Sequence, residues 1–172
     1  MAADPPVDVH VRSFAPGDRT RVVRLWEACG LTRPWNDPYS DIDRKLDRDA
    51  ELLLVGEVPV AEAAAATATT TAAAAAAAAG ATMAGGVVAT VMAGYDGHRG
   101  WINYLAVDPD HRGEGHGRTM MEAAETRLLA LGCPKANLQV RTDNPDAVAF
   151  YEALGYLEDA VVSMGRRLIT DD

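Results

Sequence analysis

Apolar residues alternate along the chain between strand-like and helix-like spacing, which predicts strands and helices in turn. Strands are predicted where apolar and β-branched residues alternate or run together. Helices are predicted where apolar residues recur every three to four positions between a cap and a closing glycine. The predicted strands span 10–14, 51–57, 86–93, 101–107 and 136–140, with last strands from Tyr156 onward. The first predicted helix follows Asp18, with an apolar face of Val22, Val23, Leu25, Trp26 and Cys29, and the second carries Ile42 and Leu46. A long third helix has Met120, Met121, Ala124, Leu128 and Leu131 on one face, with Gly132 past its end. The last helix opens at Asn144–Pro145, and its inner face is formed by Ala147, Phe150, Tyr151 and Leu154.

This alternation predicts one mixed sheet covered by helices, which is an α/β or α+β domain. A chain of 172 residues has the length of one domain, so we predict a single domain over 1–172. Residues 58–82 interrupt the pattern and include eight consecutive alanines at 72–79. Because this segment has no apolar stripe to dock onto a core, we interpret it as a low-complexity insertion in a β-hairpin. A partner-binding arm is the alternative.

The net charge of -9 argues against nucleic acid as a partner, because phosphate binding requires clustered Lys and Arg. Among the 16 basic residues only Lys45 and Lys135 are lysines. Two interpretations of this acidic, lysine-poor composition stay open. It is typical of adaptation to high salt, where screening relieves self-repulsion, and a GC-rich genome would produce the same bias.

No membrane segment and no metal are expected. Residues 63–95 carry no charge, but the first part is Ala and Thr, and the second is short and β-branched, as in a buried strand. Cys29 and Cys133 lie too far apart in sequence for a metal spacing and are interpreted as free thiols of a reducing cytoplasm. The N-terminus has neither the basic nor the apolar region of a signal peptide.

A glycine-rich turn is the first motif with a chemical meaning. Residues 112–117 connect a predicted buried strand end, 105–107, to the start of a long helix. Glycine lets the backbone approach a ligand, and the N–H groups of a helix N-terminus favour anionic oxygens, so a diphosphate is expected there. Two common phosphate-binding spacings fail: a P-loop needs glycine where Arg112 stands, and a dinucleotide-binding turn needs glycine at Arg118.

The pattern Arg-x-x-Gly-x-Gly, met by Arg112, Gly115 and Gly117, resembles the acetyl-CoA motif of the GNAT N-acetyltransferases. Residues 144–156 are similar to the second signature of that family, with Asn, Ala, Tyr and Gly-Tyr in register. The segments 31–37 and 94–100 most resemble its YpeA-type subgroup. The resemblance covers nearly the whole chain. It implies a GNAT fold, in which a mixed, mainly antiparallel sheet of six or seven strands is flanked by about four helices.

The resemblance also implies which residues hold acetyl-CoA, the expected co-substrate. Main-chain groups of Leu105, Ala106 and Val107 would hold the acetyl carbonyl and the pantetheine arm. The diphosphate would be bound by the turn and the residue after it, namely Arg112, Gly113, Glu114, Gly115, His116, Gly117 and Arg118. Asn144, a helix cap by position, would contact the cofactor arm. Tyr151, which lies on an apolar helix face, would sit beside the sulfur.

Direct transfer to an amine needs a leaving-group acid and a means of taking a proton from the amine. Tyr151 is the expected general acid. Many family members carry a glutamate on the fourth strand, but here the strand reads Trp101-Ile102-Asn103-Tyr104. Asp96, His98, Glu27 or an ordered water are therefore the candidate bases. His111 and His116 are expected to be exposed spacers in the turn.

The acceptor is expected to be a primary amine, on a small molecule or a protein. The resemblance places the loop between the first two helices over the amine site, which makes Arg33, Trp35, Asn36 and Asp37 the candidate acceptor residues. The alternative is that Pro34 and Pro38 simply shape a packed loop. A homodimer is left open. The rival to an acetyltransferase is a module that binds acyl-CoA without turnover, which the missing strand carboxylate would permit.

Overall fold

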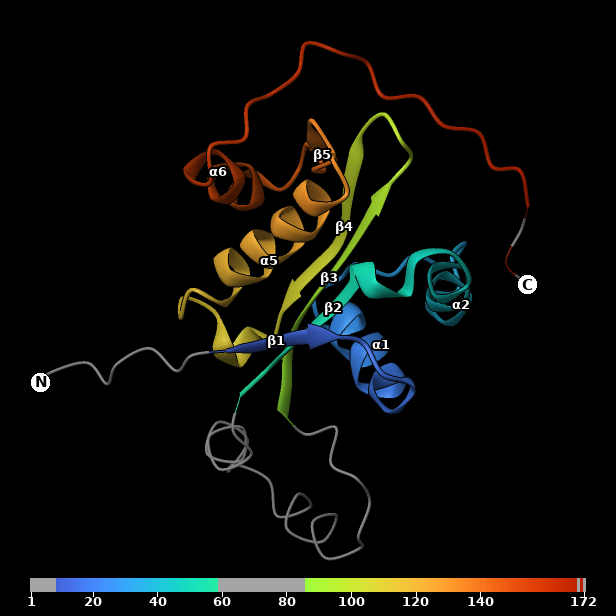
Figure 1. Cartoon of the computed structure of the whole chain (residues 1–172), viewed down its shortest axis with the longest axis vertical. Helices are drawn as coiled ribbons and strands as arrows, with labels where there is room; N and C mark the ends of the chain where they lie inside the picture. The colour runs from blue at the N-terminus through green and yellow to red at the C-terminus, as the bar shows by residue number, and fades with distance from the viewer. Residues whose placement is uncertain (1–8, 59–85, 170, 172) are drawn as a thin grey trace, which may run out of the picture.

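The computed structural model of the protein describes residues 9–58, 86–169 and 171 (Figure 1). Within these residues, five strands and four α-helices follow one another as the periodicity predicts. In chain order they are β1 (His10–Ser13), α1 (Arg19–Ala28), α2 (Pro38–Asp49), β2 (Leu53–Glu57), β3 (Val87–Tyr95), β4 (Gly100–Val107), α5 (His116–Ala130), β5 (Ala136–Leu138) and α6 (Pro145–Ala153). The predicted α/β class is confirmed.

The strands form one mixed sheet in the order β1-β2-β3-β4-β5. The first four strands pair antiparallel, and β5 pairs parallel to β4. A parallel neighbour needs a crossover, and α5 provides it between β4 and β5. Five strands are present in the described residues, so the expectation of six or seven is wrong.

The missing strands were expected after Tyr156, where residues 157–169 are instead irregular and exposed. Their apolar side chains include Val161, Val162 and Met164, which are 77%, 87% and 92% exposed. β-propensity reports a fit to a pleated, half-buried surface, and without a partner strand it does not produce a strand. Figure 1 shows this segment leaving α6 and passing over the domain toward the side of α2.

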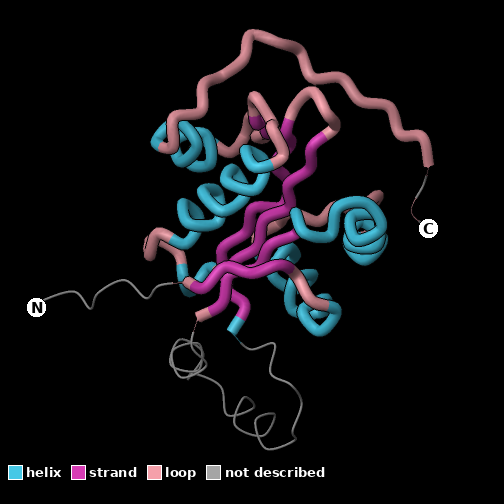
Figure 2. The backbone as a smooth tube through the Cα atoms, viewed as in Figure 1, coloured by secondary structure: helices cyan, strands magenta, loops and turns pink. Residues whose placement is uncertain are grey.

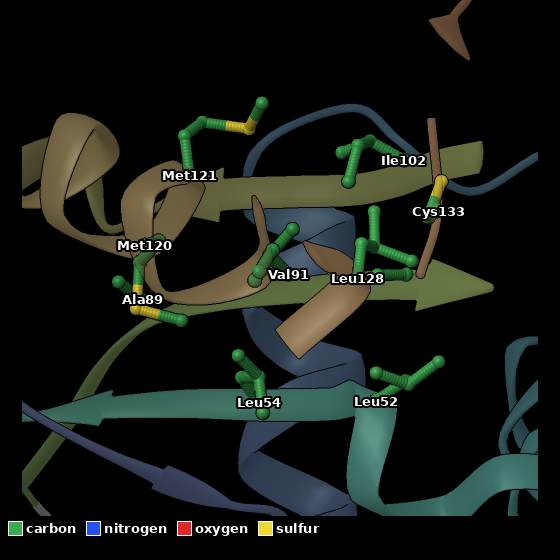
Figure 3. Close-up of a cluster of buried hydrophobic side chains, with 11 residues drawn as sticks. Leu52, Leu54, Ala89, Val91, Ile102, Met120, Met121, Leu128 and Cys133 are labelled. Carbon is green, nitrogen blue, oxygen red and sulfur yellow. The ribbon is translucent and has the colours of Figure 1, made fainter. Parts of the chain in front are cut away.

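Helices cover both faces of the sheet, with α5 and α6 on one side and α1 and α2 on the other (Figure 2). Alternation along β2 supplies both cores, because successive side chains of a strand point to opposite faces. Leu54 joins Val91, Met120 and Leu128 beneath α5 (Figure 3). Leu53 joins a second core that contains the buried side chains of α1, namely Val22, Val23, Leu25 and Trp26. The helical spacing predicted for α1 is therefore confirmed.

The predicted Ala/Thr insertion falls between two neighbouring strands of the sheet. Its first residue, Val58, is buried and donates a main-chain hydrogen bond of 2.8 Å to Gly86. Residues 59–82, the rest of the predicted insertion, lie outside the described residues. In the parts of the chain that are described, no helix combines the length and apolar character needed to cross a bilayer.

Candidate active site

A bulge in the middle of β4 changes the direction of its side chains. Met92 of β3 lies opposite Asn103, and Thr90 lies opposite Ala106, so β4 holds one more residue than β3 between these pairs. Tyr104 takes up the extra length with a φ of 50°, in the left-handed region, unique among the non-glycine residues described. As a result Asn103 and Tyr104 both face the side of α1 and α2, whereas Ile102 and Leu105 face α5.

Buried contacts hold the bulge in place. The ring of Tyr104 stacks on Trp26 of α1 with centroids 4.0 Å apart. Trp26 Nε1 donates a 2.9 Å hydrogen bond to Thr90 Oγ1, which in turn donates to the Tyr104 carbonyl oxygen at 3.1 Å. A left-handed tyrosine costs about 1–3 kcal/mol, so the surrounding contacts must over-determine its conformation. The hydroxyl of Thr90 connects the helix to the strained strand.

Replacing Thr90 with Val is expected to lower the free energy of unfolding by about 1–3 kcal/mol. The substitution keeps the side-chain shape but leaves the buried Trp26 N–H and the Tyr104 carbonyl without the hydroxyl that joins them. Urea denaturation measures the change, with Thr20→Val on the exposed side of α1 as the matched control. Equal stability of the two variants would contradict the role assigned to Thr90.

Beyond the bulge, β4 loses its neighbour. The pairs with β5 end at Ile102 and Leu138, whereas β4 continues to Val107. Within the described residues, no strand therefore pairs with this edge of β4 at residues 103–107. Leu105 and Val107 face the α5 core, and Ala106 faces the α1 core. This open edge includes residues 105–107, the segment that the family resemblance assigns to the acetyl carbonyl and the pantetheine arm.

The turn after β4 leads directly to the N-terminus of α5. Asp108 fixes its start: the carboxylate accepts from Arg21 of α1 at 2.5 Å and from the Asp110 N–H at 3.1 Å. Burial opposes ionisation of Asp108, but these hydrogen bonds outweigh burial and lower its pKa. Gly113 and Gly115 have φ of 83° and 90°, a region that side chains disfavour. The backbone conformation of the turn thus explains why glycine occupies these two positions.

Main-chain donors of the turn are free to bind a ligand. In the described part of the chain, the N–H groups of residues 112–115 donate no main-chain hydrogen bond. The first turn of any α-helix also leaves N–H groups without an intrahelical acceptor, and α5 begins at His116. Arg112 lies over the end of β4, with Nη2 3.6 Å from Cys29 Sγ and Nε 3.4 Å from the Val107 oxygen. Arg118 is exposed on the first turn of α5.

The second motif forms α6, which packs on the α5 side of the sheet. Asn144 caps it, with Oδ1 accepting from the Ala147 N–H at 3.2 Å, so the predicted cap is confirmed. Phe150 of α6 would lie 3.1 Å from a Cβ at Gly117, which explains a glycine inside the first turn of α5. Tyr151 packs edge-on against Phe150 and Tyr156. Burial raises the pKa of Tyr151 to about 12.

A pocket of about 560 Å³ opens on the opposite side of β4, between α2 and the strand pair β3–β4. Asn103 and Tyr104, the two residues that the bulge turns to this side, line it. Its charged residues come mainly from α2 and include Asp41, Arg44 and Asp49. The bulge thus borders both the open edge of β4 and the pocket.

The structure distributes the predicted acceptor residues unevenly. Of that loop only Asn36 lines the pocket, and Trp35 is exposed. Arg33 donates to the carbonyls of Gly30 and Thr32. Asp37 caps α2 by accepting from the Tyr39 N–H and the Ser40 hydroxyl, and these bonds lower its pKa. The loop therefore serves to shape the start of α2, with Asn36 as its contribution to the pocket.

Of the three side chains predicted as candidate bases, one lines the pocket and two lie outside it. Asp96 lines the pocket, whereas His98 and Glu27 do not and are exposed. Asp96 Oδ1 accepts from the N–H groups of Arg99 and His98, each at 2.7 Å, and these bonds lower the pKa of the carboxyl. A carboxylate stabilised in this way is a weak proton acceptor.

Sequence reasoning missed a carboxylate that α2 brings to β4. Asp41 lines the pocket, and its Oδ2 accepts a 2.6 Å hydrogen bond from the Tyr104 hydroxyl. Its Oδ1 accepts from Arg44 at 2.8 Å. Burial, together with the Asp41 carboxylate, raises the pKa of Tyr104 above its ordinary value, so the phenol stays protonated as a donor. The helical phase of Asp41, one residue before the buried Ile42, was the available signal.

The prediction that His111 and His116 are exposed spacers is wrong. They are 9% and 2% exposed. A short 3-10 helix, Pro109–His111, turns the first one inward. The second begins α5 one turn before the buried Met120, and residues four apart share a helix face. Both imidazoles lie beneath the turn.

Comparisons with known proteins agree with this geometry. Residues 21–156 match the family model described as "Acetyltransferase (GNAT) family". An acetyltransferase of Sodalis glossinidius is 43% identical over 164 residues, which cover 95% of this chain and 98% of the relative. Ard1 of Thermoplasma volcanium has the same fold, with a TM-score of 0.67 at 24% identity over 90% of this chain and 86% of that one. The NatC complex bound to Gag peptide and CoA is similar too, with a TM-score of 0.63 at 16% identity over 87% and 85% of the two chains. The chain belongs to the GNAT family of acetyltransferases and is an acyltransferase.

Proposed function

We propose that the protein moves an acetyl group from acetyl-CoA directly to a primary amine, with both substrates bound together. The observation that carries this proposal is the edge of β4 at residues 103–107, with which no described strand pairs, beside the N–H groups of residues 112–115, which donate no main-chain hydrogen bond. The thioester arm of acetyl-CoA can hydrogen-bond to the edge of a strand, and its diphosphate can accept from the N–H groups of a turn that follows the strand. A fold relative solved with CoA bound supports the same co-substrate.

The cofactor site divides between strand and helix. The main chain of 105–107 holds the acetyl carbonyl and the pantetheine arm, and the N–H groups of 112–117, with Arg118, hold the diphosphate. Anionic oxygens are favoured there because N–H groups and the helix dipole point the same way. Asn144 lies at the start of α6 and contacts the arm. Cys29 is not needed as a nucleophile when the amine attacks the thioester directly.

Two side chains on opposite sides of β4 act as proton donor to the thiolate and proton acceptor from the amine. Tyr151 donates to the departing thiolate, and its raised pKa of about 12 keeps it protonated at neutral pH. Asp41 receives the proton of the attacking amine, because its carboxylate lines the pocket beside the β4 bulge, next to Tyr104. The phenol of Tyr104 orients the Asp41 carboxylate. The products are the amide and the free CoA thiol, and proton exchange with solvent then deprotonates Asp41 and reprotonates Tyr151.

The acceptor enters through the pocket between α2 and β4, where three aspartates are matched by three basic residues of α2. Asn36 and Asn103 add uncharged hydrogen-bonding groups for the amine. We place the chain in the YpeA-type subgroup on the segments 31–37 and 94–100.

Release of CoA thiol with a panel of amines and peptide N-termini tests the proposal. We expect thiol release that depends on the acceptor, with the acetylated product detected by mass spectrometry. Tight binding of CoA with no acceptor-dependent release would instead support a module that senses acyl-CoA without turnover. Reactions without acceptor control for hydrolysis.

A further inference from the structure

Three side chains that could bind a metal meet beneath the turn. Oε2 of Glu114 lies 2.9 Å from Nε2 of His116 and 3.4 Å from Nδ1 of His111. All three ligand atoms lie within 4.8 Å of one another. They come from a segment of six residues that the positive φ of Gly113 and Gly115 folds back on itself.

The imidazole of His116 is the unexplained group of this cluster. His116 is only 2% exposed, and among the described residues its Nε2 has no hydrogen-bond partner. The carboxylate oxygen of Glu114 is close enough, but it lies in a direction that gives no hydrogen bond. Buried polar atoms without a partner are rare and point to a missing water, ion or function. A cation between the nitrogen and the oxygen would satisfy both atoms.

The ligand set and the spacing fit a borderline transition metal. Two imidazoles and one carboxylate, with a fourth position open, are a common set for Zn²⁺. Bonds of about 2.0–2.2 Å in a tetrahedron place ligand atoms roughly 3.3–3.6 Å apart. The two measured separations, 2.9 and 3.4 Å, lie near this range. The two histidine nitrogens lie within 4.8 Å of one another, and the 2.9 Å pair of Glu114 and His116 would lengthen slightly around a bound metal.

A metal here would not compete with the proposed diphosphate. The metal uses side chains of the turn, whereas the diphosphate uses its main-chain N–H groups. Glu114 places a negative charge in the turn that we propose binds the diphosphate, and a bound cation would offset this charge. This last point rests on the proposed function, but metal binding itself does not. The separation of the two cysteines, on which the expectation of no metal rests, carries no information about these histidines.

We propose that His111, Glu114 and His116 form a binding site for one divalent transition metal of the Zn²⁺ class. Titration of the full chain, freed of metal by a chelator and without a histidine tag, with Zn²⁺ alone tests the proposal by calorimetry. CoA is left out, because its own thiol and phosphates bind metals. We expect saturation at about one equivalent per chain, and a tetrahedral visible spectrum when Co²⁺ replaces Zn²⁺.

Variants locate the metal. Glu114→Gln and His116→Leu are each expected to weaken Zn²⁺ binding at least about 100-fold, since losing an outer partner alone costs about 10–100-fold. Glu114 is a third exposed, so its variant tests the site even where His116→Leu disturbs folding. His10→Ala and His98→Ala remove the other two histidines, both exposed, and are expected to bind Zn²⁺ as the natural chain does.

Three results would overturn the site: no saturable binding near one equivalent, full binding by Glu114→Gln, or loss of binding in the His98→Ala control. Because no step of this experiment involves acetyl transfer, its failure leaves the proposed function untouched. Conversely, failure of the acceptor screen leaves the metal site untouched.

Discussion

Replacing Tyr151 with Phe is expected to lower kcat by about 10²–10⁴-fold, the usual contribution of a general acid, with little change in CoA affinity. The departing thiolate has a pKa of about 8.5, and a phenol nearby donates a proton or a hydrogen bond to it as the bond breaks. Burial raises the pKa of Tyr151 to about 12, so the donor is present throughout the neutral and mildly alkaline range. Phe keeps the edge-on packing against Phe150 and Tyr156. Steady-state kinetics and calorimetric titration with CoA separate the two effects.

The matched control is Tyr156→Phe, in the same aromatic cluster. Its hydroxyl donates a 2.7 Å hydrogen bond to Glu125, so this variant is expected to lose stability, by about 0.5–1.5 kcal/mol, and to keep its turnover. Tyr151→Phe turning over as fast as the natural protein would remove Tyr151 from the mechanism. Equal losses in the two variants would assign the effect to packing.

The helical and strand periods predicted most of the fold because they report which face each element buries. The apolar positions of α1, α5 and α6 and the succession of strands along the chain follow from local spacing, whereas the order of the strands in the sheet does not. Leu131, predicted on the inner face of the long helix, is an exception: it follows the last residue of α5 and is 49% exposed. A period of 3.6 residues does not mark the residue at which the helix ends.

Site residues were predictable where the backbone conformation restricts the residue type. They were not predictable where contacts between residues distant in sequence determine which way a side chain points. Glycines with positive φ and the Asn144 cap are visible in the sequence because few residues fit those positions. Strict alternation would place Tyr104 on the side of Ile102, and the bulge that reverses it depends on Trp26 and Thr90. Asp41 reaches β4 across 63 positions of sequence. Helical phase indicates that Asp41 lies beside the buried face of α2, but it does not identify the partner on β4.

The absence of the predicted last strands has a related physical cause. Residues 157–169 have the apolar, β-branched composition of a strand, but strand formation requires an edge to pair with. In the structure this segment contacts the loop before α2, where Arg167 donates to the Trp35 carbonyl at 2.6 Å. Composition alone does not specify which of these arrangements forms.

Replacing Asp41 with Asn is expected to lower kcat/KM for the amine by about 10²–10⁴-fold near neutral pH, as for loss of a general base. The amide has nearly the shape of the carboxylate and still accepts from the Tyr104 hydroxyl through its oxygen, but it does not take a proton. CoA affinity should stay unchanged, since Asp41 lines the pocket on the far side of β4 from α5. Kinetics with saturating acetyl-CoA measure the effect.

The pH profile separates a base from a structural residue. A lysine-like amine has a pKa of about 10.4 and a peptide N-terminus one of about 8, so the neutral fraction of either acceptor rises with pH and the need for a base falls. The defect of Asp41→Asn should therefore shrink as pH rises, whereas a structural defect would stay constant. Asp47→Asn, exposed on the same helix, is the control and is expected to retain full activity. If Asp96→Asn shows the pH-dependent loss and Asp41→Asn does not, the base is Asp96, and the hydrogen bonds that occupy its oxygen in the free protein must open when the amine binds.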